Sequence, residues 1–256
     1  MKGMIFAAGL GSRLRPLTDT LPKLLIEVDG MPLIEHVICK MKAVGITSIV
    51  INVFHLGNQI IDFICDKKSF GINIHISDEK DRLLDTGGGI ANNLDLLDGS
   101  DPVVIYNGDI FSNFPLEEMI DQHKRSLNDV TLLTSDRKTS RKLVFDKNDR
   151  MRGWIQNSGE KIRPEDLDIR DKKAYAFGGV HVMNTSVFNT LKEYSKLRGG
   201  VFSITDFYIE YCNQVHIGRY NQENEFYWYD IGKPDVLKKV TGLTITEYMA
   251  WYRKRV

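Results

Sequence analysis

The sequence is poor in cysteine, and the three that it has lie far apart, at Cys39, Cys65 and Cys212. An odd count without CxxC spacing argues against a disulfide framework and against a cysteine zinc site, so we expect a reducing compartment. No apolar run approaches the roughly 20 residues that a membrane span needs, and the apolar N-terminus is too short for a signal peptide. These absences predict a soluble, cytoplasmic protein without a membrane partner.

An excess of charge of either sign is also missing. Lysine and arginine together number 34, as do aspartate and glutamate, and the formal net charge is therefore zero. Without a basic field, charge gives no support for nucleic-acid binding or for binding to a membrane surface. An anionic ligand would have to be held by a few well-placed cations.

The length of 256 residues suits one large α/β domain or two small ones. Short apolar strands alternate with segments of helical periodicity in the first half, which indicates βαβ units, a parallel sheet and a doubly wound α/β fold. The expected strands are 4–7, 49–53, 72–76 and 103–106, and the expected helices are 32–44, 59–65 and one that opens near Gly89.

The second half has a different rhythm. We expect helices over 115–127, 203–212 and 234–251, strands over 130–134 and 174–183, and a polar, irregular segment over 141–173. No linker rich in proline, serine or glycine separates the halves. We therefore predict a single domain over 1–256 that falls into two halves, 1–112 and 113–256.

A glycine-rich loop with basic residues follows the first strand. Its sequence, AAGLGSRLRPLT, places Arg13 and Arg15 close to two glycines, and Lys23 follows ten positions after Arg13. Glycines let the backbone approach phosphate oxygens, and convergent cations offset the charge of a triphosphate. The P-loop pattern GxxxxGK[ST] is absent, and a dinucleotide GxGxxG pattern fails at Leu14, although Asp29 has the spacing of a ribose-binding acid.

Two aspartates follow apolar strand-like runs. Asp109 follows the apolar strand that begins at Val103 and comes directly after a glycine, and Asp230 follows Phe226–Tyr229 and precedes a helix. Magnesium in proteins is often held by one or two carboxylates together with phosphate oxygens. Each acid could instead be a turn or helix-cap residue, and the sequence does not show whether the two meet.

These motifs together resemble the sugar-1-phosphate nucleotidyltransferases. The resemblance extends over nearly the whole chain and implies a Rossmann-like, mostly parallel sheet with an antiparallel, sugar-binding second half, the nucleotide-diphospho-sugar transferase fold. It implies that Arg13 binds the pyrophosphate part of the nucleotide, that Lys23 lies near the α-phosphate and the sugar phosphate, and that Asp109 and Asp230 jointly bind Mg²⁺. The residues implied to cradle the nucleotide phosphates are Ala8, Gly9, Leu10, Gly11, Ser12 and Arg13.

Other parts of the nucleotide and sugar sites follow from the same resemblance. The segment LLDTGGG resembles the ETGGG form found in bacterial N-acetylmuramate 1-phosphate uridylyltransferases, with Asp85 in place of the glutamate. The three glycines fit a close backbone approach at a helix start. The resemblance implies nucleotide contacts from Glu79, Thr86, Gly87 and Asn107, and sugar contacts from Gly179 and Asp109; Glu79 stands one position further from the motif than in the family. The strand 176–183 and the helix start 202–207 resemble parts of the family's sugar site, and His181 is expected to be structural.

The resulting hypothesis is an enzyme of NDP-sugar biosynthesis, in which NMP from an NTP is joined to a sugar 1-phosphate and pyrophosphate is released. Arg13, Lys23 and Asp109 are the expected catalytic residues, and UTP with N-acetylmuramate 1-phosphate are the favoured substrates. Alternatives are a GTP-dependent mannose or heptose 1-phosphate enzyme, a CTP-dependent phosphocholine enzyme, and a nucleotide-sugar-binding module without catalysis. The sequence leaves monomer and homodimer equally open.

Overall fold

The computed structural model describes residues 1–100, 102–220 and 226–241. The chain divides into two compact units, each assembled from separate segments of sequence. Unit 1 comprises Met1–Leu83, Ile105–Leu116 and Glu225–Val256, and unit 2 comprises Leu84–Val104 and Glu117–Asn224.

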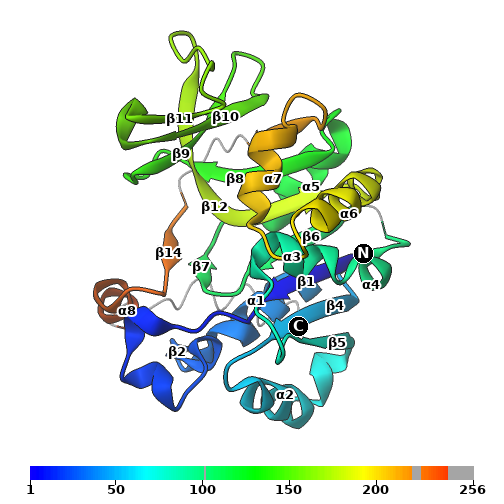
Figure 1. The fold of residues 1–256 in the computed structure, drawn as a ribbon. Helices are drawn as coiled ribbons and strands as arrows, with labels where there is room; N and C mark the ends of the chain where they lie inside the picture. The colour runs from blue at the N-terminus through cyan, green and yellow to red at the C-terminus, as the bar shows by residue number, and fades with distance from the viewer. Residues whose placement is uncertain (101, 221–225, 242–256) are drawn as a thin grey trace. The chain divides into compact units, whose positions relative to one another are not determined.

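Unit 1 is built on parallel strands. Strand β4 pairs in parallel with β1 on one side and with β5 on the other (Figure 1). Apart from Phe6, the apolar residues of β1 and β4 are buried, which is why these strands read as continuous apolar runs. The bounds are β1 Lys2–Phe6, α1 Leu33–Ala43, β4 Ser48–Val53, α2 Gly57–Asp66 and β5 Asn73–Asp78.

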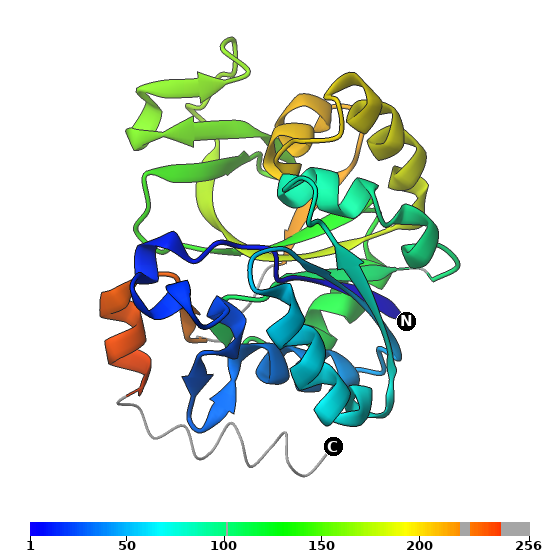
Figure 2. The same cartoon turned by 60° about the horizontal axis from the view of Figure 1, so that its bottom comes forward.

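Later segments of the chain complete unit 1. Strand β7 (Ile110–Ser112) pairs antiparallel with β14 (Trp228–Asp230). Asp230 therefore stands opposite Ile110, the residue that directly follows Asp109. Helix α8 (Pro234–Thr241) follows and lies beside the loop segment after β1 (Figure 2). That loop contains three short 3-10 turns, Ser12–Leu14, Leu17–Asp19 and Lys23–Leu25, before the small ribbon of β2 (Glu27–Val28) and β3 (Met31–Pro32).

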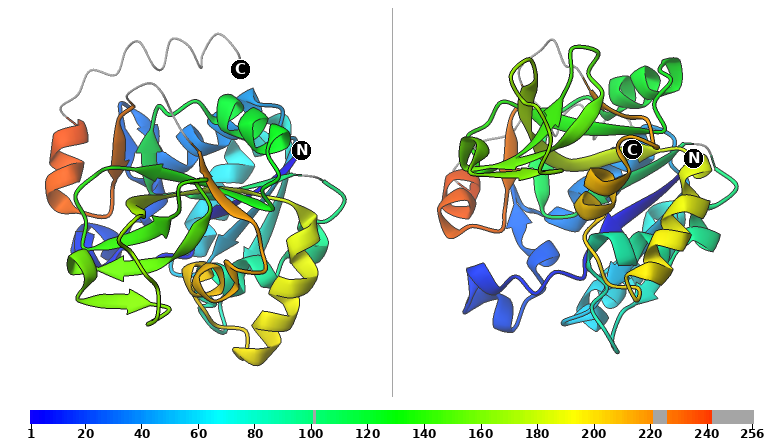
Figure 3. Two further views of the ribbon diagram at one scale, coloured as in Figure 1. Left: turned by 90° about the horizontal axis from the view of Figure 1, so that it is seen from above. Right: turned by 45° about the horizontal axis from the view of Figure 1, so that its top comes forward.

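Unit 2 is mainly antiparallel. Strand β12 pairs with both β8 and β9, β9 pairs with β10, and β10 pairs with β11, all antiparallel; β13 joins β8 in parallel. Helix α3 contacts α6 and α7, and α7 packs against β10 (Figure 3). The bounds are α3 Asp85–Ala91, α4 Leu94–Leu97, β6 Val103–Asn107 (shared between the units), α5 Leu116–Arg125, β8 Val130–Ser135, β9 Arg141–Phe145, β10 Met151–Gln156, β11 Lys161–Arg163, β12 Lys173–Met183, α6 Phe188–Leu197, α7 Ile204–Tyr211 and β13 Ile217–Tyr220.

The expected α/β fold class, with a mixed parallel and antiparallel sheet, is confirmed, but two local expectations were wrong. The segment 141–173 is not irregular, because it contains β9, β10 and β11. In β10, buried and partly exposed residues alternate, which gives a half-buried sheet face. The helix expected near Gly89 begins at Asp85, so that the three glycines lie inside it. Of the helix expected over 234–251, the part from 242 onward lies outside the described residues.

The glycines of α3 have a packing reason that outweighs their low helix propensity. A Cβ on Gly87 would lie 2.2 Å from the Phe202 ring, and one on Gly88 would lie 2.2 Å from the Gly200 carbonyl oxygen. The Gly87 amide donates to the Phe202 carbonyl over 2.9 Å. Only glycine allows this approach of two backbones, and the packing offsets the roughly 1 kcal/mol per residue that glycine costs in a helix.

The three cysteines are free. None of the helices within the described ranges combines the length and the apolar character that a membrane span requires.

Candidate functional site

The loop after β1 presents backbone donors at the carboxyl edge of the parallel strands of unit 1. Gly11 has φ of +63°, and a Cβ there would lie 2.8 Å from Thr18 Cγ2. The Thr18 hydroxyl donates to the Gly11 carbonyl over 2.8 Å, which fixes the curvature of the loop. Among the described residues, no acceptor faces the amide N–H groups of Gly9, Leu10 and Gly11. The loop therefore has backbone donors available for an anion.

Lys23 is the centre of a four-residue charge cluster in unit 1. Its ammonium group is hydrogen-bonded to Asp109 Oδ2, and Asp230 Oδ1 lies 3.8 Å from the same nitrogen. Arg13 Nη2 lies 3.6 Å from Asp230 Oδ2. The Lys23 side chain is only 9% exposed, while that of Arg13 is 56% exposed. Two acids that are 121 positions apart in the sequence thus converge on one ammonium group, and their charges are balanced by the two cations.

Backbone pairing and two glycines hold this cluster in place. The Ile231 amide donates to the Asp109 carbonyl over 3.0 Å, and the Gly232 amide donates to Asp230 Oδ1 over 2.8 Å. A Cβ on Gly232 would lie 2.5 Å from Arg13 Nη2 and 2.6 Å from Lys23 Nζ. Glycine at position 232 therefore leaves the space in which the two cations approach the acid.

The donor set fits a hard divalent cation. Carboxylate oxygens are the ligands that Mg²⁺ prefers, and one or two carboxylates suffice when substrate phosphates and waters complete the shell. Asp109 and Asp230 reach the same ammonium nitrogen, so their separation permits a shared ion. Within the described residues, no group of three or more histidine, cysteine, aspartate or glutamate side chains gathers to form a complete protein cage.

Glu79 is connected to the start of the loop through Asn52. Asn52 Nδ2 donates to Glu79 Oε1 over 2.8 Å, and Asn52 Oδ1 accepts from the Ala7 amide over 2.9 Å. Both side chains are buried, with 3% of Asn52 and 4% of Glu79 exposed. Asn52 precedes the last residue of β4, and the sequence analysis overlooked it because a single polar residue in an apolar strand gives little signal.

Three predicted contact residues belong to unit 2, where each has a role in the fold. The Thr86 hydroxyl accepts from the Ile204 amide over 3.0 Å, and Gly87 makes the close contact with Phe202 described above. Gly179 has φ of +75° at an irregularity in the pairing of β12 with β8, where a β-bulge calls for glycine. Asn107, the last residue of β6, belongs to unit 1. The assignment of these four residues to nucleotide or sugar stays a prediction.

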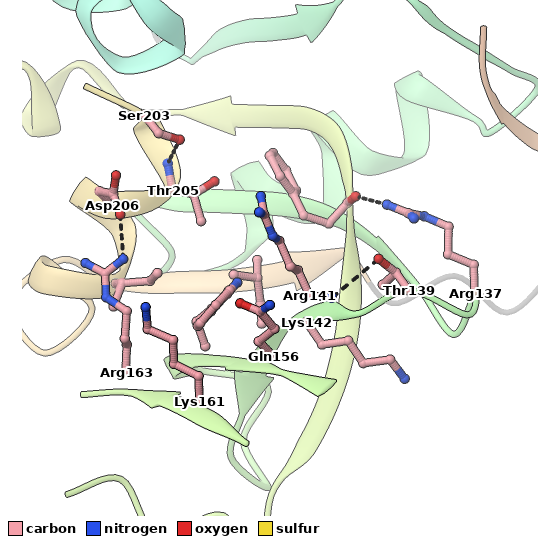
Figure 4. A pocket seen from close by; sticks show the side chains of 14 residues that line it. Arg137, Thr139, Arg141, Lys142, Gln156, Lys161, Arg163, Ser203, Thr205 and Asp206 are labelled. Carbon is pink, nitrogen blue, oxygen red and sulfur yellow. Dashed lines mark hydrogen bonds and ion pairs between the residues drawn. The ribbon is translucent and has the colours of Figure 1, made fainter. Parts of the chain in front are cut away.

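Unit 2 contains a pocket of about 500 Å³ between the β9–β10–β11 strands and the start of α7 (Figure 4). It includes residues from both segments that resemble the family's sugar site, Phe177 from β12 and Ser203, Thr205 and Asp206 from the start of α7. Its remaining lining comes mostly from the segment 137–163, including Arg137, Arg141, Lys142, Lys161 and Arg163. The sequence pattern did not reveal this basic lining, because most of it comes from the segment 141–173, which was expected to be irregular.

His181 is a core residue of unit 2. It is fully buried, and its Nδ1 is hydrogen-bonded to the Tyr208 hydroxyl. Burial lowers the pKa of His181 to about 3, so the ring is neutral at physiological pH. The geometry agrees with the structural role expected from the sequence.

Comparisons with known proteins give sequence matches over much of the chain. A family model described as nucleotidyl transferase matches residues 2–246. An N-acetylmuramate alpha-1-phosphate uridylyltransferase of Neisseria meningitidis serogroup B is 50% identical over 113 residues, which are 44% of this chain and 48% of that protein. A mannose-1-phosphate guanyltransferase of Gibberella zeae is 31% identical over 238 residues, covering 91% of this chain and 61% of the relative. The matched region thus spans between about half and two thirds of these relatives' own lengths.

The fold is also found among solved structures. A Bacillus anthracis protein described as a glucose-1-phosphate thymidylyltransferase, crystallised with sucrose, superposes with a TM-score of 0.78 at 21% identity. The similarity covers 98% of this chain and 99% of that one. The expected nucleotide-diphospho-sugar transferase fold is thereby confirmed.

Proposed function

The chain belongs to the nucleotidyl transferase family, and we propose that it transfers a nucleoside monophosphate from an NTP to a sugar 1-phosphate. The observation that carries this proposal is the convergence of Lys23, Asp109 and Asp230 in unit 1, the unit that also contains the glycine loop. A structural salt-bridge cluster would not need unpaired backbone donors in the loop or a glycine at position 232.

In the proposed reaction, an oxygen of the sugar phosphate attacks the α-phosphorus of the NTP. The new bond joins that oxygen to the α-phosphorus, the bond from the α-phosphorus to the bridging oxygen breaks, and pyrophosphate leaves with the electron pair. The attacking oxygen is already anionic at neutral pH, so no protein nucleophile is required. Catalysis then consists of positioning and of charge stabilisation.

The residues of unit 1 have distinct parts in this scheme. The free amides at Gly9, Leu10 and Gly11 bind phosphate oxygens, and the exposed Arg13 neutralises the charge that develops on the leaving pyrophosphate. Lys23 is nearly buried, so its charge acts in a low-dielectric setting on the phosphates that meet at the α-phosphorus. Asp109 and Asp230 would hold Mg²⁺, which supplies further charge neutralisation at the phosphates when it is bound.

For substrates we propose UTP and N-acetylmuramate 1-phosphate. The support is the resemblance of LLDTGGG to the uridylyltransferase form and the 50% identity to the Neisseria relative over 113 residues. The mannose-1-phosphate guanyltransferase of Gibberella zeae, which matches more of the chain at lower identity, favours GTP and mannose 1-phosphate as the second candidate pair. We propose the cytoplasm as the location, in keeping with the three free cysteines.

A pyrophosphate-release assay tests the proposal. Four NTPs are each combined with N-acetylmuramate 1-phosphate, N-acetylglucosamine 1-phosphate, mannose 1-phosphate and phosphocholine, with and without EDTA. We expect the highest kcat/KM for UTP with N-acetylmuramate 1-phosphate, and loss of turnover in EDTA that Mg²⁺ restores. If the protein binds nucleotide but turns over none of the substrate pairs, the non-catalytic module is favoured. Turnover that survives EDTA would contradict the metal assignment.

A further inference from the structure

The lining of the pocket in unit 2 has an excess of positive charge. Its lining contains five basic residues and a single acid, Asp206. Asp206 is already engaged, because Arg163 Nη1 lies 2.6 Å from its Oδ1, and Arg163 also approaches Glu210 within 3.5 Å. In contrast, the charged ends of Arg141 and Lys161 have no acidic partner among the described residues. The pocket thus contains at least two cations without a counter-charge.

Strand register places these two cations on the same face. Gln156 of β10 stands opposite Arg141 of β9 and also opposite Lys161 of β11, so the three residues form one row across the sheet. At a strand spacing of about 4.8 Å, the Cα atoms of Arg141 and Lys161 are roughly 10 Å apart. Figure 4 shows both side chains reaching into the space below the start of α7, whereas Lys142 points away from it.

The next row of the same face supplies apolar surface. Trp154 stands opposite Leu143 on one side and Arg163 on the other, and Trp154, Leu143 and Phe177 all line the pocket. Aromatic faces bind the C–H surface of a sugar ring, while the amide of Gln156 and the hydroxyl of Thr205 suit its hydroxyl groups. A volume of about 500 Å³ is sufficient for a substituted hexose.

We propose that this pocket selects an acceptor sugar that carries a second acidic group besides its phosphate, with Arg141 and Lys161 binding that group. The inference rests on the proposed function, because it assigns the pocket to the acceptor of that reaction. Two uncompensated cations would be a poor match for a neutral hexose and a good match for a carboxylate on a ring substituent. N-acetylmuramate 1-phosphate has such a carboxylate on its lactyl ether, and N-acetylglucosamine 1-phosphate lacks it.

The test compares these two acceptors, which share the ring, the acetamido group and the phosphate. Arg141→Gln, Lys161→Gln and the double variant remove charge while they keep a polar side chain. The control is Lys147→Gln, which removes an exposed cation from the turn between β9 and β10 that does not line the pocket. Melting temperatures show whether each variant folds.

We expect kcat/KM for the acidic acceptor to fall about 10- to 100-fold in the double variant, since each lost contact is a charge-assisted hydrogen bond. For the neutral acceptor we expect a change of less than about threefold. An equal loss for both acceptors would assign the cations to the phosphate or to the fold, and would overturn the proposal. Unchanged kinetics of the double variant with both acceptors would also overturn the proposal.

A binding measurement separates this proposal from the proposed function. Free N-acetylmuramic acid and N-acetylglucosamine, neither of which has a phosphate, are titrated calorimetrically into the intact protein and the double variant. Binding that requires the carboxylate and is lost in the double variant would support the pocket assignment even for a chain without turnover. Absent binding, or equal binding of the two sugars, would overturn it whether or not the enzyme is active.

Discussion

The proposed anion-binding sites of the two units have opposite arrangements of charge. In unit 1, Lys23 and Arg13 are balanced by Asp109 and Asp230, and the central lysine is nearly buried. In unit 2, Arg141 and Lys161 are exposed and lack an acidic partner within the described residues. A buried cation needs an acidic partner because removing its charge from water is costly. An exposed cation is stabilised by water and needs no acidic partner before a ligand binds.

The difference has a consequence for function. In the cluster of unit 1, binding of a phosphate and a metal ion would exchange existing charge pairs for new ones, so small displacements should have large effects. In the pocket of unit 2, binding would add charge pairs to groups that were solvated, so the effects should be smaller and should depend on salt.

Removing an acid from the unit 1 cluster has the largest expected effect. Asp109→Asn deletes a proposed metal ligand and the main partner of Lys23, and we expect kcat to fall about 10³-fold in the pyrophosphate-release assay. The melting temperature should change little, because Asp230 remains 3.8 Å from the same ammonium group. Asp62→Asn, an exposed acid on α2, is the control. Normal turnover by Asp109→Asn in Mg²⁺ alone would remove Asp109 from the mechanism.

The geometry of the cluster is tested at Gly232. A methyl group there would lie within 2.7 Å of Arg13, Lys23 and Asp230, and all three would have to shift. Because a displacement of about 1 Å at a reacting centre costs about 10²-fold in rate, we expect Gly232→Ala to lower kcat by that factor. A kcat within threefold of the unsubstituted enzyme would show that the cluster tolerates displacement.

Gly9→Ala makes the same glycine-to-alanine change in the loop after β1. Apart from its neighbours in the chain, no residue comes within 4 Å of a Cβ at this position, so packing of the fold does not require glycine. If a triphosphate lies against the loop, the methyl group meets the ligand instead, and we expect KM for the NTP to rise about tenfold with an unchanged melting temperature. Equal KM values for the variant and the unsubstituted protein would place the triphosphate elsewhere.

Added salt should weaken binding at the pocket of unit 2 more than binding at the cluster of unit 1. The exposed cations of unit 2 are screened by added ions, whereas the nearly buried Lys23 is screened much less. Between 0.05 and 0.5 M NaCl at fixed Mg²⁺, we expect KM for N-acetylmuramate 1-phosphate to rise about three- to tenfold. KM for N-acetylglucosamine 1-phosphate should rise less, since that acceptor lacks the carboxylate. Parallel curves for the two acceptors would contradict the contrast between the units.

The smallest effect concerns the core of unit 2. The folded-state pKa of His181 is lowered to about 3, while an unfolded chain takes up this proton near pH 6.5. The stabilisation from neutral His181 is therefore fully present above pH 6.5 and is lost as the pH falls from 6.5 towards 3. Its contribution to the slope is at most about 1.4 kcal/mol per pH unit.

Urea unfolding at several pH values measures this slope. His181→Asn keeps a polar group near the Tyr208 hydroxyl and has no titrating ring, so the free energy of unfolding should fall less steeply below pH 6.5. Identical slopes for the variant and the unsubstituted protein would show that His181 does not titrate differently on unfolding.

The extent to which sequence predicted structure differed between the units. In unit 1, long apolar runs and helical periodicity located the parallel strands and their helices to within a few residues. In unit 2, the short strands β9, β10 and β11 were missed, because basic residues interrupt their apolar pattern. The start of α3 was misplaced because the low helix propensity of glycine was given more weight than the packing of Gly87 and Gly88 against Gly200 and Phe202.

Local patterns of glycine, charge and apolar runs were sufficient to predict the α/β class, the family resemblance, and the loop and acids of the proposed chemistry. Three relations became visible in the folded chain alone: Lys23 joins Asp109 to Asp230, Asn52 connects Glu79 to Ala7, and Arg141 and Lys161 share a pocket. Each of these relations joins residues on different strands or loops. Distances between such residues are set by strand pairing and packing, which no local pattern encodes.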